Sequence, residues 1–232
     1  MSLPPNDWSL AQEVLAEAGA DLPVPWEDET RPSVLAFFLT VGQILLHPKR
    51  FFGGLALTGG LGDPLAFALL VGTGGMLSLL LWTTVWQGSM LGALPTEFAT
   101  THLQDLAPEP LLIVGIILLV PFYVVGSQFL TSGLLWLPLR WLGPADVTYE
   151  AVFRLVAYSQ AAMVFGLLPW LGGLLAQLWQ PVLIIIGLSQ TLGLSWGRGL
   201  LALVLAGLLV ALGFLLLLMG LVALGLWRLL GS

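Results

Sequence analysis

Polar side chains that could do chemistry are concentrated in the second half of this chain, within strongly apolar sequence. Glu150 and Arg154 stand four residues apart, so a helix would place them on one face, where they can form an ion pair. Tyr158, Ser159 and Gln160 come next. Arg154 is therefore expected either to pair with Glu150 at a membrane boundary or to contact a substrate or a lipid phosphate.

Uncharged polar residues accompany this pair in neighbouring apolar segments. Because polar side chains in lipid seek one another, they can form a hydrogen-bond network that holds helices together. The alternative is a polar path or a ligand cavity beside the proline kinks at Pro121 and Pro181. The residues of this predicted network or ligand contact are Glu150, Arg154, Tyr158, Ser159, Gln160, Gln177, Gln180, Gln128 and Ser127.

Catalytic and metal-binding patterns are absent from the sequence. It contains no cysteine, no HExxH, GxSxG or P-loop motif, and its two histidines, His47 and His102, fall on opposite faces of the predicted membrane topology. No acid lies deep in a predicted span, which argues against a proton-coupled or cation-coupled carrier. We therefore predict a protein that is not an enzyme and has no catalytic residue, metal site or cofactor.

The composition is that of a membrane protein. The chain is 58% hydrophobic and 9% charged, whereas soluble domains carry about 25% charged residues. The charge-free stretch 155–197 is too long for one helix across a hydrocarbon core of about 30 Å, so its Pro–Gly turn at 169–173 predicts a helical hairpin. We expect an all-α, polytopic membrane helix bundle, residues 63–232, with about five transmembrane helices at about 64–87, 110–137, 150–168, 173–192 and 199–228.

Two N-terminal regions precede the predicted bundle. Residues 1–31 form an acidic tail, which either docks loosely on the membrane face or binds a partner. Residues 32–62 comprise an amphipathic helix and a linker. We expect this helix to lie at the membrane interface, with Lys49 and Arg50 near lipid headgroups and the following Phe pair in the acyl region. The alternative is a helix packed on the spans.

The basic residues predict the orientation. Five spans place Arg228 on one side of the membrane and all the other basic residues on the opposite side. The positive-inside rule then puts the N-terminus in the cytoplasm and the C-terminus outside, in the cytoplasmic (inner) membrane. The residues assigned to the cytoplasmic side are Arg31, Lys49, Arg50, Arg140, Arg154 and Arg198.

Residues 149–159, YEAVFRLVAYS, resemble the "tFRvvaYs" signature of the Yip family of Ypt/Rab-interacting membrane proteins. The resemblance extends over about residues 26–230. It implies a cytosolic N-terminal region, five spans and an external C-terminus. The signature is closer to that of prokaryotic members, so the Rab-linked role of eukaryotic members is not transferred. Further similar segments are 168–173, 183–188, 48–52 and 64–68.

These observations favour a non-enzymatic scaffold or adaptor in membrane organisation or trafficking-like processes. Its expected partners are membrane lipids, a cytoplasmic protein bound through residues 1–52, and a second copy of the chain; no basic tract suggests nucleic acid. The alternative is a small-solute, ion or lipid transporter or channel that uses the kinked hairpin. A hydrated cavity that reaches Tyr158, Gln160, Gln177 or Gln180 would distinguish the two.

Overall fold

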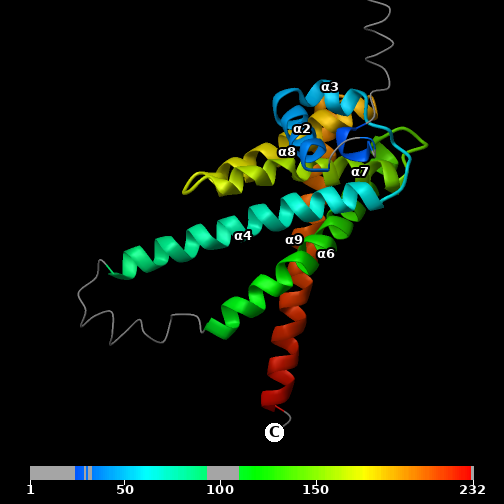
Figure 1. The fold of residues 1–232 in the computed structure, drawn as a ribbon. Helices are drawn as coiled ribbons and strands as arrows, with labels where there is room; N and C mark the ends of the chain where they lie inside the picture. Colours follow the sequence, from blue (N-terminus) through cyan, green and yellow to red (C-terminus); the bar gives the residue numbers. More distant parts are fainter. Residues whose placement is uncertain (1–23, 29, 31–32, 93–109, 231–232) are drawn as a thin grey trace, which may run out of the picture.

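The computed structural model describes residues 24–28, 30, 33–92 and 110–230. Most of the acidic tail and His102 therefore lie outside the described residues. Within them, all regular structure is helical (Figure 1). In chain order the elements are η1 (Pro25–Glu27), α2 (Ser33–Leu46), α3 (Pro48–Gly53), α4 (Gly62–Gly92), α6 (Pro110–Leu142), α7 (Tyr149–Ser159), η3 (Gln160–Leu167), α8 (Gly172–Thr191) and α9 (Trp196–Leu230).

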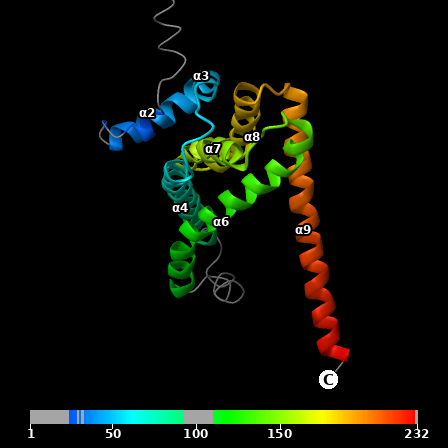
Figure 2. The same cartoon turned by 90° about the vertical axis from the view of Figure 1, so that its right-hand side faces the viewer.

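Four of the described helices are long and apolar enough to cross a membrane: α4, α6, α8 and α9, over Gly62–Trp86, Ile113–Leu142, Gly172–Thr191 and Trp196–Ala223. This confirms the predicted all-α membrane bundle. The helices α4, α6 and α9 diverge from a compact end that contains α2, α3, α7 and α8 (Figures 1 and 2). Proline does not end α6, which continues through Pro121 and Pro138.

The remaining predicted span, 150–168, corresponds to α7 and η3, which form one continuous segment. Thr148 caps α7, its hydroxyl accepting the Ala151 N–H at 3.2 Å. At Gln160 the backbone changes from α-helix to 3₁₀-helix. Every side chain from 151 to 159 is buried, so this segment forms the centre of the bundle. A five-span count that includes it stays a prediction.

Glycines allow the helices around this centre to pack through their backbones. A Cβ added at Gly75 on α4 would lie 2.2 Å from the Met163 carbonyl oxygen of η3, and one at Gly166 would lie 2.6 Å from the Gly75 carbonyl oxygen. On the other side of the segment, a Cβ at Gly187 of α8 would lie 2.8 Å from Leu155. Larger residues at these positions would push the helices apart.

The N-terminal helices α2 and α3 pack on the bundle, and this changes one expectation. Phe51 and Phe52 do not extend toward lipid; they are 7% and 0% exposed. The Phe51 ring packs against Tyr158 of α7, with ring centroids 5.4 Å apart. The opposite face of α2 carries the exposed side chains of Val34 and Phe38. The segment is therefore a helix packed on the bundle, with one apolar face left uncovered.

Candidate functional site

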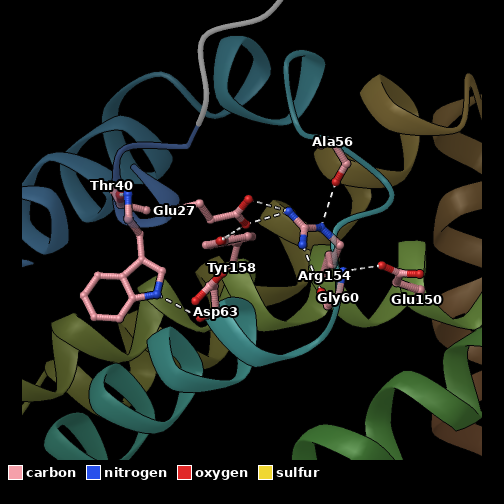
Figure 3. Close-up of polar contacts among 9 residues, drawn as sticks. Glu27, Thr40, Ala56, Gly60, Asp63, Glu150, Arg154 and Tyr158 are labelled. Atoms are coloured by element: carbon pink, nitrogen blue, oxygen red, sulfur yellow. Dashed lines mark hydrogen bonds and ion pairs between the residues drawn. The ribbon is translucent and has the colours of Figure 1, made fainter. Parts of the chain in front are cut away.

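A buried arginine organises the compact end of the molecule. The Arg154 side chain is 0% exposed, and its guanidinium donates to two other segments of the chain (Figure 3). Nε donates to the Ala56 carbonyl at 2.8 Å, and Nη1 donates to the Gly60 carbonyl at 3.0 Å. Nη2 donates to both carboxylate oxygens of Glu27, at 2.6 and 2.8 Å. Arg154 therefore joins α7, the α3–α4 loop and η1.

Tyr158 completes the coordination of the Glu27 carboxylate. Its hydroxyl donates to Glu27 Oε1, one turn after Arg154 on the same face of α7. The Tyr158 ring is fully buried and lies 5.2 Å from the Phe67 ring of α4, centroid to centroid. The carboxylate is thus bound by one charged donor and one neutral donor. Such charge-assisted bonds are stronger than bonds between neutral groups.

The segment that carries Glu27 is positioned by its tryptophan. The Trp26 backbone N–H donates to Thr40 Oγ1 of α2 at 3.0 Å, and its indole N–H donates to the Asp63 carbonyl at 2.8 Å. The Trp26 ring packs edge-on against Phe37 and Phe67. Trp26 therefore holds η1 between α2 and α4, and Glu27 points inward to Arg154.

Glu150 has a different partner from the one predicted. The expected ion pair with Arg154 is replaced by the Glu27 pair, and Glu150 instead accepts the Gly60 N–H at 2.7 Å. Residues 59 and 60 adopt positive φ angles of 129° and 92°, which favour glycine. A Cβ at Gly59 would lie 3.3 Å from Arg154 Nη1. The glycine loop lies against the guanidinium, and Gly60 contacts both side chains: its N–H donates to Glu150 and its carbonyl accepts from Arg154.

We name this set, Glu27, Arg154, Tyr158 and Glu150 with loop residues 56–60, the arginine clamp. Its charges and donors are used within the protein, and the described residues contain no group of three acids or histidines that could hold a metal. Nearby, the Tyr149 hydroxyl donates to the Phe129 carbonyl at 3.1 Å. The clamp is therefore suited to fastening chain segments together.

A second polar region lies between α6 and α8. A pocket of about 300 Å³ brings Gln160, Gln177 and Gln180 together, three of the residues predicted from the sequence. We call it the glutamine pocket. Its other polar lining residues are Tyr123, Ser127 and Thr131, and its apolar lining comprises Gly72, Met76, Val124, Met163, Pro181 and Ile184. None of these lining residues is charged.

The predicted polar residues divide between a closed network and this pocket. Buried Gln128 donates to Ser132 Oγ at 3.3 Å and to the Phe153 carbonyl at 3.2 Å, and it accepts from Gln160 at 3.4 Å. Ser159 donates to the Leu155 carbonyl of its own helix. By contrast, the described part of the chain offers no hydrogen-bond partner to the side-chain amides of Gln177 and Gln180.

The cations predicted to meet lipid headgroups lie at the surface. Lys49 and Arg50 on α3 are exposed, as is His47 before them. Their contact with lipid stays a prediction. Sequence reasoning did not identify Glu27, Trp26 or the loop carbonyls as site residues. The strings Pro23-Val24-Pro25-Trp26 and Gly59-Gly60 were the available signals, because they mark extended or unusual backbone that tertiary contacts must hold.

Comparison with known proteins identifies a family. The family model described as the Yip1 domain matches residues 42–219, which include the arginine of the clamp and the entire lining of the glutamine pocket. No curated protein and no solved structure matches the chain. The match covers well over half of the chain and agrees with the resemblance found around residues 149–159. This integral membrane protein therefore belongs to the Yip family.

Proposed function

We propose that this protein is a non-enzymatic membrane scaffold that holds its N-terminal segment on the helix bundle for cytoplasmic partners. The arginine clamp carries this proposal, because it binds Glu27, the end of η1, to the central helix α7. Because Glu27 is tied to the core, the chain that precedes it starts from a fixed point on the bundle. Preorganisation of this kind lowers the entropy lost when a partner binds.

The uncovered surface of α2 and α3 supports the same function. Val34, Phe38 and Leu46 are 71%, 65% and 76% exposed, and the exposed cations Lys49 and Arg50 follow directly. Apolar side chains beside cations match an anionic membrane surface, where the cations meet phosphate and the apolar groups enter the acyl region. This surface, with the preceding tail, is the proposed contact region for lipids and a protein partner.

The proposed orientation places this surface in the cytoplasm. The helix α3, the end of α6 and the start of α9 all belong to the compact end of the molecule (Figure 2), and they carry Lys49, Arg50, Arg140 and Arg198. A reporter fused after Ser232 should be external, as should one inserted within 98–108. A cytoplasmic reporter at Ser232 would contradict the five-span topology.

Co-purification of the full-length protein from crosslinked cells tests the scaffold. Proteins captured by the wild type should be lost with Glu27→Ala, which releases the N-terminal segment, and retained with Arg198→Ala at an exposed cation. Membrane insertion and expression of the two variants must match. Identical captured proteins for both variants would contradict the role of the clamp in presentation.

The glutamine pocket favours transport as a second candidate function, because a polar cavity among the spans is what that function requires. Flux of a tested solute into proteoliposomes that disappears with Gln160→Leu would support transport and contradict a purely structural role. Flux that is unchanged by Gln160→Leu would show that the solute does not pass through this pocket.

A further inference from the structure

We propose that the glutamine pocket binds the uncharged headgroup of a neutral glycerolipid, a diacylglycerol or a monoacylglycerol, that enters from the surrounding bilayer. The inference is independent of the scaffold proposed above, which rests on the arginine clamp. It starts from the two glutamine amides, Gln177 and Gln180, for which the described residues provide no hydrogen-bond partner.

The pocket has two facing polar walls. Tyr123, Ser127 and Thr131 recur at intervals of four residues along α6, so they share one face of that helix. Gln177 and Gln180 stand three residues apart on α8 and share a face in the same way. The two walls therefore present hydroxyl and amide groups toward a common space, where one ligand could contact both.

The pocket opens between the ends of the candidate spans. Tyr123, Thr131 and Gln177 are exposed, whereas Val124 and Ile184 are buried and form its floor. All of these residues lie within the candidate membrane spans of α6 and α8: Tyr123 and Thr131 are at least ten residues from either end of Ile113–Leu142, and Gln177 is five residues after Gly172. The mouth therefore faces the hydrocarbon layer, and polar groups without partners there are costly. A ligand with hydroxyl and ester groups would remove that cost.

The chemistry of the lining selects an uncharged ligand. None of the lining residues is charged, so a phosphate or ammonium headgroup would lose its hydration without gaining a counter-ion. Amides both donate and accept hydrogen bonds, which suits hydroxyl and ester groups. The volume of about 300 Å³ is at the small end of ligand sites. It suits a glycerol headgroup with the first part of an acyl chain, the rest of the chain lying in the bilayer.

Photocrosslinking in vesicles tests this proposal. The full-length protein is reconstituted in phosphatidylcholine vesicles that contain a small amount of a photoactivatable diacylglycerol, and the labelled residues are mapped by mass spectrometry. We expect labelling concentrated on α6 and α8 around the pocket. The variant Gln177→Leu/Gln180→Leu should lower that labelling about tenfold, as expected for the loss of two hydrogen bonds. Gln190→Leu, an exposed glutamine outside the pocket on the same helix, is the matched control.

Each arm has an outcome that overturns the proposal. Labelling spread evenly over lipid-facing helices, or equal in the double variant and the control, shows ordinary bilayer contact only. Equal labelling by a photoactivatable phosphatidic acid contradicts selection of an uncharged headgroup. Competition by free glycerol would identify a site for a soluble polyol in place of a lipid. A second variant, Thr131→Trp at the exposed mouth, should also lower labelling by blocking entry, without altering a buried position.

Discussion

The central segment α7 and the terminal helix α9 show opposite relations between sequence and environment. Residues 151–159 of α7 include Arg154, Tyr158 and Ser159, and all of them are buried. The helix α9 has the highest mean hydropathy of the four candidate spans and is the least buried of them, while α8 has the lowest mean hydropathy and is the most buried. In this protein the more polar helices are inside and the most apolar helix is outside.

The physical reason is that lipid, not water, surrounds the membrane-spanning helices. Lipid tails are as apolar as leucine, so burying an apolar helix inside a membrane protein gains little hydrophobic free energy. Polar groups and charges, by contrast, must find partners within the protein, and small residues let helices approach closely. This contrast predicts that truncating polar or close-packed groups around α7 lowers the free energy of unfolding substantially. Truncating apolar groups on α9 should change it little.

The largest expected effect is at Arg154. Arg154→Leu removes the cation that pairs with the Glu27 carboxylate and the donor to two backbone carbonyls, so unfolding in detergent should require about 3–5 kcal/mol less. The double variant Glu27→Leu/Arg154→Leu should recover much of this loss, because no charge is left unpaired. Arg198→Leu, at an exposed position, should change stability by less than about 0.5 kcal/mol. Equal losses for Arg154→Leu and the double variant would mean that the unpaired charge of Glu27 is not the source of the loss.

The next effect concerns the backbone contact between α4 and η3. Gly75→Ala forces its new Cβ against the Met163 carbonyl, so the helices must separate, at a cost of about 1–3 kcal/mol. Gly74, its neighbour, has no atom within 4 Å of an added Cβ, and alanine there should be neutral or slightly stabilising. Thermal unfolding of the two variants in the same detergent measures the difference. Similar stabilities would contradict this close approach.

Local sequence signals predicted the helices well but not their contacts. Charge-free runs predicted spans at 110–137 and 173–192, close to α6 and α8, because length and apolarity are local properties. The partner of Arg154 was missed because Glu27 is 127 positions away in an acidic tail, and no period links the two. The nearer acid, Glu150, satisfied the helical spacing and was preferred. Pattern alone also could not decide whether the glutamines form a network or line a pocket.

The glycines of α9 illustrate the same limit. Gly207, Gly213 and Gly220 are small residues of the kind that allow close approach between helices, yet an added Cβ at each would have no neighbour within 4 Å among the described residues. Spacing of small residues shows that a helix can be approached, but it does not show which helix approaches it. At Gly75 and Gly166 the same residue type is used for contact, because η3 lies directly against α4.

A smaller loss is expected at Tyr158. Tyr158→Phe keeps the ring packing against Phe51 and Phe67 and removes only the hydroxyl that donates to Glu27. The cost should be about 1–2 kcal/mol in detergent unfolding. Tyr123→Phe, at an exposed tyrosine in α6 for which the described residues show no hydrogen bond, should cost less than about 0.5 kcal/mol. Equal effects would show that Glu27 is held by Arg154 alone.

The smallest effect is expected on α9, and a matched pair of leucines measures it. Leu216 is 60% exposed on α9, whereas Leu155 is 1% exposed on α7. Leu155→Ala should lower stability by about 2–5 kcal/mol through the cavity it leaves. Leu216→Ala faces lipid in a single chain and should cost less than about 0.5 kcal/mol. A loss at Leu216 that grows with protein concentration would instead show that a second copy covers α9, because only an intermolecular contact depends on concentration.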